Sequence, residues 1–170
     1  FVRTRPDLLD PLYGTFAGYS PGERAGSYWT QPVFSFQDGH FACKTGYVYF
    51  RLAAEKFPGE VPPLTPHQIE ALEYFQVLAN RPDMHFSMMF QPGDLQMLNN
   101  PVTLHARSDF EDYEEEDRKR HLFRLWLSVP NSRPLSPLMA SVYRDVRPGA
   151  LRGGYPSAPG KIVFHSNAAL

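Results

Sequence analysis

The chain has 170 residues, of which 42% are hydrophobic and 21% are charged, as is usual for a globular domain. Lys and Arg number 17 against 18 Asp and Glu, so the net charge of −1 predicts no general attraction to nucleic acid or to an anionic membrane. No apolar run approaches the ~18 residues that a membrane span needs. Proline (17 residues) and aromatic residues (14%) are frequent, which favours short packed strands and ordered loops over disorder.

The start of the chain is unusual, because it begins at Phe1 and its first methionine is Met84. Since translation begins at methionine, we expect further residues upstream of Phe1 and therefore an incomplete domain. The single cysteine, Cys43, cannot form an internal disulfide, which is compatible with a cytoplasmic location. Nothing around Cys43 marks it as a nucleophile, so we expect a small buried thiol.

The first half of the chain predicts turns, a hairpin and helices. Residues 5–9 are compatible with one helical turn, and several glycines then interrupt any longer element. Aromatic, partly alternating residues flank Asp38-Gly39, which is a hairpin signal. Residues 47–50 are β-prone, or else begin a helix that runs through Glu55.

The clearest helix is predicted over residues 65–80. Thr65 is a good N-cap, Pro66 occupies the first helical position, and Gln68 completes a Thr-x-x-Gln capping box. Apolar residues then recur at helical spacing on one face, and Asn80 and Pro82 end the helix.

After this helix the hydrophobic period changes to two. Strands are predicted over residues 84–90, 95–98, 102–106 and 120–129. A type II turn is predicted over 91–94, where Pro precedes Gly. The odd positions of 120–129 are apolar and include His121, for which we expect a packed core position. One helix laid on several antiparallel strands predicts a mainly β fold with helical decoration, a sandwich or jelly roll. This domain covers residues 1–130, and residues 131–170 form a Pro/Gly/Arg-rich C-terminal tail with little periodicity, wrapping the surface or fraying.

Several catalytic motifs are excluded. Residues 18–22 match the letters of a G-x-S-x-G nucleophile elbow, but the residue after the serine is Pro21, which has no N–H for an oxyanion hole. No dinucleotide-binding, Walker A, H-E-x-x-H or cysteine-zinc motif is present.

His105 has the most informative surroundings of the six histidines. It ends the predicted strand 102–106, and the later strand carries Arg120 and Arg124 on one side, because side-chain direction alternates along a strand. Two interpretations are open. The two arginines either form ordinary ion pairs with the acidic residues 114–116, or line a polar cavity that binds a dicarboxylate through bidentate hydrogen bonds.

A family resemblance favours the second interpretation. The residues that carry it are Pro92-Gly93-Asp94-Leu95, Asn99-Asn100, Leu104-His105-Ala106-Arg107, Phe110, Asp112 and 120–127. The pattern resembles the C-terminal half of the taurine/2,4-dichlorophenoxyacetate dioxygenase (TauD/TfdA) family, most specifically over 91–128. The resemblance implies a non-haem Fe(II)- and 2-oxoglutarate-dependent dioxygenase on a double-stranded β-helix, that is, a jelly roll.

The resemblance also implies binding roles for three residues, and it identifies no catalytic residue in this chain. His105 matches the distal iron-binding histidine, and Arg120 matches the arginine that grips the far carboxylate of 2-oxoglutarate. Arg124 matches the second arginine of the Arg-x-x-x-Arg pair, which lies toward substrate or cosubstrate. Arg118 is a weaker substitute for Arg120, since it has the same strand parity but lies nearer the charged loop.

One departure from the family is large. The family takes its other two iron ligands from an H-x-D or H-x-E motif, and here no histidine has an acidic residue two positions on. The residues at those positions are Ala42, Ile69, Ser87, Arg107, Phe123 and Asn167. We therefore expect the motif upstream of Phe1, and a jelly roll that is incomplete at its N-terminal side.

The resulting hypothesis is the C-terminal part of a dioxygenase that hydroxylates a small acidic substrate, using Fe(II), O₂ and 2-oxoglutarate and giving succinate and CO₂. This chain alone is expected to be inactive. The expected partners are small molecules, with no nucleic acid or membrane, and a homo-oligomer is left open. The alternatives are a non-catalytic jelly-roll binding module with a dicarboxylate pocket and no functional metal site, and an unrelated interaction sandwich whose arginines are surface charges.

Overall fold

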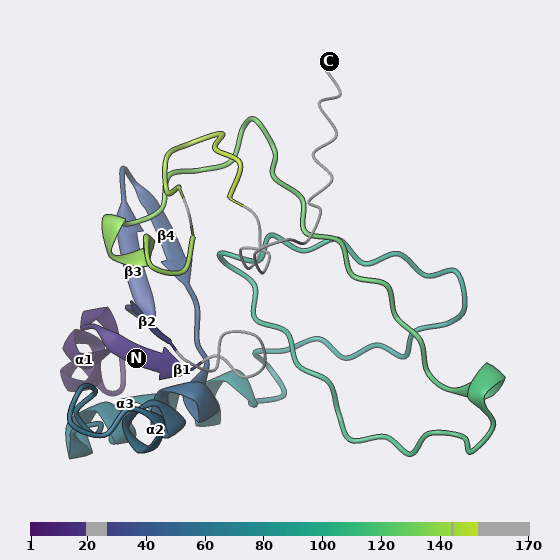
Figure 1. Ribbon diagram of the computed structural model, residues 1–170, viewed down its shortest axis with the longest axis horizontal. Coiled ribbons are helices and arrows are strands. Elements are labelled where there is room, and N and C mark those ends of the chain that lie inside the picture. The colour runs from purple at the N-terminus through teal and green to yellow at the C-terminus, as the bar shows by residue number, and fades with distance from the viewer. Residues whose placement is uncertain (20–26, 144, 153–170) are drawn as a thin grey trace.

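Two small antiparallel sheets and three α-helices pack together in the computed structural model, which describes residues 1–19, 27–143 and 145–152 (Figure 1). The described elements are η1 (Pro6–Leu8), α1 (Leu9–Tyr13), β1 (Phe16–Tyr19), β2 (Tyr28–Gln31), β3 (Phe34–Gln37), β4 (His40–Cys43), α2 (Tyr47–Lys56), α3 (Pro66–Ala79), η3 (Glu116–Arg118) and η4 (Pro137–Met139). Strand β1 pairs with β2, and β3 pairs with β4. The serine of the rejected G-x-S-x-G match lies outside the described residues.

The β3–β4 hairpin confirms the turn predicted at Asp38-Gly39. Gln37 pairs with His40 across the turn, and the two residues between them have positive φ angles of 48° and 80°. Positive φ at both central positions defines a type I′ turn, whose twist matches that of the flanking strands.

The helix α3 begins as its sequence predicts. The Gln68 N–H donates to Thr65 Oγ1 over 3.1 Å, and the Thr65 N–H donates to Gln68 Oε1 over 3.0 Å. Two N–H groups that have no partner inside the helix are thereby satisfied. The open choice over residues 47–50 is also resolved, because they form the first turn of α2.

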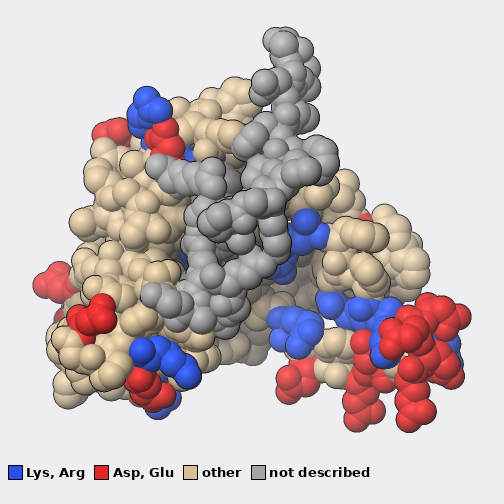
Figure 2. Space-filling model, in the orientation of Figure 1, with Lys and Arg blue, Asp and Glu red and all other residues tan. Residues whose placement is uncertain are grey.

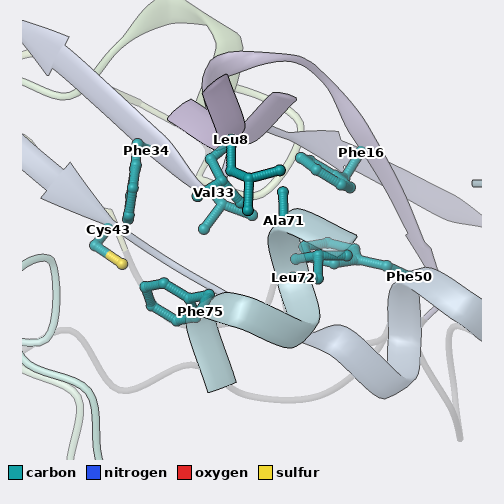
Figure 3. Close-up of a cluster of buried hydrophobic side chains, with 10 residues drawn as sticks. Leu8, Phe16, Val33, Phe34, Cys43, Phe50, Ala71, Leu72 and Phe75 are labelled. Atoms are coloured by element: carbon teal, nitrogen blue, oxygen red, sulfur yellow. The ribbon is translucent and has the colours of Figure 1, made fainter. Parts of the chain in front are cut away.

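A first apolar core lies between the N-terminal helices, the strands and α3 (Figure 3). Its buried members are Leu8, Leu12, Phe16, Val33, Phe34, Cys43, Phe50, Ala71, Leu72 and Phe75. Phe50 of α2 stacks on Phe16 of β1, with ring centres 5.0 Å apart. The buried thiol expected for Cys43 is confirmed, and burial raises its pKa to about 12.

A second apolar core joins β4 to the segment around η4. Its buried members are Ala42, Leu135, Met139, Val142 and Tyr143, and Trp29 packs against both cores. The hydroxyl of Ser141 accepts the N–H of Thr30 over 2.9 Å and donates to the carbonyl of the same residue. These contacts cover the free edge of β2. Residues 135–143 are thus part of the packed structure, although their sequence shows no periodicity.

Residues 81–130 form an extended arm that leaves the packed part of the molecule (Figure 1). None of the four strands predicted in this arm forms there, because its backbone lies opposite no other strand of the described chain. The predicted turn at 91–94 is present, with Gly93 at a φ of 95° and the Asp94 N–H donating to the Gln91 carbonyl over 3.0 Å. The turn therefore forms from its own residues, whereas the predicted strands would need a neighbouring strand to pair with.

The apolar side of the arm is exposed. Phe123, Leu125 and Leu127 are 91%, 83% and 71% exposed. The core position expected for His121 is wrong in this structure, since His121 is also exposed and contacts the Phe123 ring. The small antiparallel sheets and few helices are consistent with the expected mainly β class, but the described residues do not close into a double-stranded β-helix. Within the same residues, no helix has the length and apolar content to cross a bilayer.

Candidate functional site

The candidate site lies on the arm between two anchoring points. At the first, the Cys43 N–H at the end of β4 donates to the Pro101 carbonyl over 2.7 Å. The Val102 and Thr103 N–H groups both donate to the Asn99 carbonyl, so the chain turns sharply here before His105. His105 itself lies four residues beyond the anchor, in extended chain, and is exposed.

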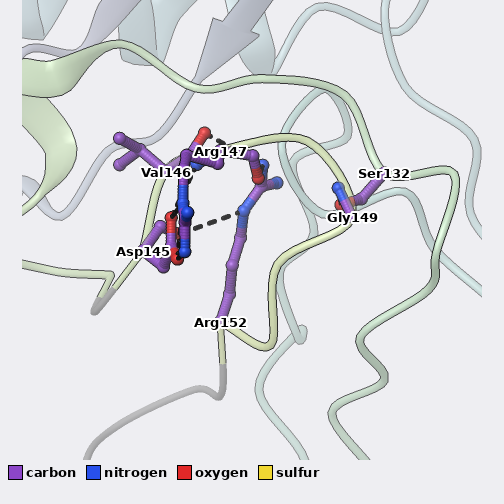
Figure 4. A network of polar contacts seen from close by, with 6 residues as sticks. All are labelled: Ser132, Asp145, Val146, Arg147, Gly149 and Arg152. Carbon is purple, nitrogen blue, oxygen red and sulfur yellow. Dashed lines mark hydrogen bonds and ion pairs between the residues drawn. The ribbon is translucent and has the colours of Figure 1, made fainter.

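The second anchor is a network around Arg152 (Figure 4). The Arg152 guanidinium donates to the carbonyls of Arg133, Asp145, Val146 and Arg147. The backbone N–H of Arg152 donates to Ser128 Oγ over 3.1 Å. The Gly149 N–H donates to the hydroxyl of Ser132 over 3.0 Å. Arg147 pairs with Asp145 and lowers the pKa of that carboxyl to about 2. The end of the arm is thereby tied to the second core.

Phe110 brings two arginines of the arm together. The guanidinium carbon of Arg107 lies 4.4 Å from the centre of the Phe110 ring, and that of Arg120 lies 5.3 Å from the same centre. Both distances fall within the ~6 Å at which a cation is attracted to an aromatic face. Arg120 is therefore held near Arg107, which is two residues from His105.

Asp112 fixes the backbone at the same place. Its Oδ1 accepts the N–H of Arg120 over 2.8 Å and the N–H of Tyr113 over 3.1 Å. The loop between Phe110 and Arg120 is consequently closed by one carboxylate, and the arginine side chain is left to project beside the aromatic ring.

The acidic loop pairs with basic residues other than the two candidate arginines. Arg118 lies 3.4 Å from Glu115 and its guanidinium carbon is 3.9 Å from the Tyr113 ring centre, while Lys119 pairs with Glu116. Acidic and basic side chains gather at the outer end of the arm, around η3 (Figure 2). Within the described ranges, neither Arg120 nor Arg124 forms an ion pair. The ion pairs with residues 114–116 that the sequence left open are thus not formed by these two arginines.

The inward-facing cavity expected around the arginines is not formed in this structure. Arg120 and Arg124 are both exposed, because the segment that carries them has no partner strand and hence no inner face. Among the described residues Arg124 forms no hydrogen bond, ion pair or cation–π contact. The structure therefore brings together only Arg120 and the neighbourhood of His105. Sequence analysis gave Phe110 and Asp112 no role, since nothing local shows that they contact a residue eight to ten positions later.

The described residues do not make a complete iron site. They contain no group of three His, Cys, Asp or Glu side chains placed to hold a metal ion. A non-haem Fe(II) site of this type uses two histidines and one carboxylate. His105 is chemically suited to be one ligand, but among the described residues it does not belong to a set of three such ligands.

Arg107 and Arg120 thus carry exposed guanidinium groups near His105, and neither forms an ion pair with another described residue. Guanidinium groups of this kind are suited to bind carboxylates. Comparison with known families makes the assignment specific. Residues 3–126 match the model of the family described as taurine catabolism dioxygenase TauD, TfdA family. The chain belongs to this family, as its sequence motifs predict.

Two relatives illustrate the family. The chain is 33% identical over 150 residues to FR-33289 synthase of Streptomyces rubellomurinus, a match that covers 84% of this chain and 43% of that protein. It is 31% identical over 131 residues to the taurine hydroxylase-like protein SAT17 of Stachybotrys chartarum, which covers 73% of this chain and 32% of that protein. The chain therefore spans less than half the length of either relative. Because the chain belongs to this family, the alternative of an unrelated interaction protein with a β-sandwich fold is excluded.

Proposed function

We propose that this chain is the C-terminal part of a non-haem Fe(II)- and 2-oxoglutarate-dependent dioxygenase that hydroxylates a small acidic organic substrate. O₂ and 2-oxoglutarate are the cosubstrates, and succinate and CO₂ are the coproducts. Residues 1–130 belong to the dioxygenase domain in this proposal, and residues 131–170 form its C-terminal segment. Membership of the TauD/TfdA family supports the reaction class.

The observation that carries the proposal is the placement of Arg120. Its guanidinium lies beside Phe110 and near Arg107, whereas the neighbouring Arg118 is engaged by Glu115. An arginine that has no carboxylate partner in the described protein can offer two parallel N–H groups to a ligand carboxylate. We assign Arg120 to the far carboxylate of 2-oxoglutarate.

Arg124 is assigned to the same pocket. It lies four residues after Arg120, and in extended chain such residues point to the same side. A second cation on that side favours a substrate that carries its own negative charge, or a second contact to the cosubstrate. This is the basis for an acidic substrate.

His105 supplies one iron ligand in the proposal, and the remaining ligands come from the part of the domain outside these residues. The chain spans only 43% and 32% of the two relatives, which supports the proposal that the iron ligands are divided between this chain and the rest of the domain. Bound Fe(II) would supply the activation of O₂. Since the described residues do not complete the iron site, we assign no chemical step to this chain alone.

The exposed apolar side of the arm supports the same division. Large apolar side chains that share one side of an extended segment, such as Phe123, Leu125 and Leu127, are normally covered. We propose that the rest of the domain covers this apolar side, and that strands pairing beside residues 120–129 close the jelly roll around the opposite side, which carries Arg120 and Arg124.

Turnover by the full-length protein tests the proposal. With Fe(II), O₂ and ascorbate, we expect 2-oxoglutarate to be converted to succinate, and His105→Ala and Arg120→Gln to lower this conversion at least tenfold. Arg118→Gln is the matched control, and it should retain most of the activity. Binding of 2-oxoglutarate without turnover would identify the non-catalytic binding module instead. Unchanged succinate formation by His105→Ala would overturn the ligand assignment.

A separate titration tests whether the site is incomplete in this chain. The 170-residue chain, titrated anaerobically with Fe(II) and 2-oxoglutarate, should give no metal-to-ligand absorption band. A strong band from this chain alone would contradict the division of the iron site.

A further inference from the structure

Lys44 occupies a fixed position between the two cores. Its N–H donates to the Val33 carbonyl over 2.9 Å, and its own carbonyl accepts Gln31 Nε2 over 3.0 Å. The preceding residues of β4 alternate, with Ala42 in the second core and Cys43 in the first. Lys44 follows Ala42 by two positions, so its side chain points toward the second core.

The amine of Lys44 contacts an aromatic residue of the second core. Nζ lies 4.6 Å from the centre of the Tyr143 ring and 3.5 Å from its hydroxyl. No carboxylate among the described residues forms an ion pair with it. Because burial penalises the charged ammonium form, the pKa of Lys44 falls from 10.5 to about 8.

Two buried polar atoms on residues that neighbour Lys44 have no hydrogen-bond partner within the described part of the chain. They are Oε1 of Gln31, whose amide nitrogen binds the Lys44 carbonyl, and Oγ1 of Thr45, the next residue in the chain. Buried polar atoms nearly always have a partner, either protein, water or ligand. The backbone around Lys44 is therefore lined by polar atoms, and the Lys44 side chain is itself only partly buried, which leaves it open to a small molecule.

We propose that Lys44 is a covalent attachment site for a small, uncharged aldehyde. The neutral amine adds through its lone pair to the carbonyl carbon, and the carbonyl oxygen takes a proton to give a carbinolamine. Loss of water then gives an imine, so that one amine and one aldehyde yield one imine and one water. The Tyr143 hydroxyl, 3.5 Å from Nζ, is placed to donate the proton that water loss requires.

The two other lysines in described positions lack this combination. Lys56 is exposed at the end of α2, and its Nζ lies 5.9 Å from the Tyr19 ring centre. Lys119 pairs with Glu116. Lys56 is therefore the internal reference for an ordinary lysine of the same chain.

Reductive labelling of the 170-residue chain tests the proposal. The chain is treated with limiting acetaldehyde and cyanoborohydride between pH 6.5 and 10, and the modified lysines are quantified by peptide mass spectrometry. At pH 7 we expect Lys44 to be modified about tenfold or more faster than Lys56, since a lower pKa leaves more neutral amine. The Lys44 rate should level off above about pH 8, where its amine is neutral.

Variants separate the contributions. Lys44→Arg should remove this adduct and leave Lys56 labelling unchanged, and Tyr143→Phe, which keeps the ring, should slow Lys44 labelling at least threefold. Equal rates and equal pH profiles for Lys44 and Lys56 in the unaltered chain would overturn the proposal. An unchanged Lys44 rate in a folded Tyr143→Phe chain would overturn the role of the hydroxyl.

Discussion

The guanidinium carbon of Arg120 lies 5.3 Å from the centre of the Phe110 ring, although the two residues are ten positions apart in the chain. Two positions earlier, Arg118 has an equivalent relationship with Tyr113 at 3.9 Å, and it also pairs with Glu115. One arginine of the loop is thus balanced by a carboxylate, and the other is held by an aromatic ring alone. Among the described residues Arg120 has no carboxylate partner, and this difference from Arg118 supports the proposal that Arg120 binds a ligand.

Removing the Phe110 ring should weaken the binding of 2-oxoglutarate. The ring contacts Arg120 and Arg107, and a cation–π contact at an exposed site contributes ~0.5–1 kcal/mol. We expect Phe110→Ala to raise the Kd for 2-oxoglutarate about two- to fivefold, measured by calorimetry on the full-length protein with Fe(II) under argon. Tyr113→Ala is the matched control, because that ring lies under Arg118. Equal effects of the two substitutions would remove the special role of Phe110.

The capping box of α3 gives a prediction for stability. Thr65→Ala removes the acceptor of the Gln68 N–H and should lower the free energy of unfolding by ~1 kcal/mol. Urea unfolding of the 170-residue chain, followed by circular dichroism, measures this change. His67→Ala, an exposed substitution in the same helical turn, should change the stability by less than half as much. A larger loss from His67→Ala would contradict the capping role.

Arg152 should control the order of the segment that ends the arm. Arg152→Ala removes the donor to four carbonyls, and hydrogen exchange at the Leu135 and Gly149 amides should become about tenfold faster, equivalent to roughly 1.4 kcal/mol. Arg152→Lys keeps the charge but not the planar fork, and should rescue little of this protection. Arg147→Ala breaks only an exposed ion pair with Asp145 and should have a small effect.

The low pKa of Lys44 predicts how its contribution to stability depends on pH. Burial lowers the pKa in the folded state from 10.5 to about 8, so between these values the unfolded chain binds more protons than the folded chain. The Lys44 contribution to stability therefore rises as the pH rises from 8 to 10.5, and it is least favourable below pH 8. We expect Lys44→Met to raise the urea midpoint more at pH 7 than at pH 10. The reverse order would show that the amine is stabilised as the ammonium ion.

Local signals in the sequence predicted local structure well. The Thr65 and Gln68 pair and the Asp38-Gly39 turn are realised, because every group they need lies within a few residues. The strands predicted over residues 84–129 have the right alternation, but a strand also needs a neighbour, and alternation cannot say whether one is present. The packing of Tyr143 and Met139 on β4 was missed, because irregular segments bury side chains without any period.

The sequence predicted the candidate site only in part, because some of its contacts join residues that are not close together in the chain. Family motifs singled out His105, Arg120 and Arg124. The contact between Phe110 and Arg120 depends on how the acidic loop closes, which Asp112 determines by accepting the Arg120 N–H. No spacing rule relates these residues, so the contact became visible only in three dimensions.

The affinity of the full-length protein for 2-oxoglutarate tests the central claim most directly. Calorimetry with Fe(II) under argon should show that Arg120→Gln weakens binding roughly 10- to 100-fold, since a hydrogen-bonded ion pair contributes ~1.5–3 kcal/mol. Arg118→Gln, which removes an equal charge two residues away, should change the Kd by less than twofold. If the two substitutions weaken binding equally, or if Arg120→Gln leaves it unchanged, Arg120 is not the cosubstrate anchor.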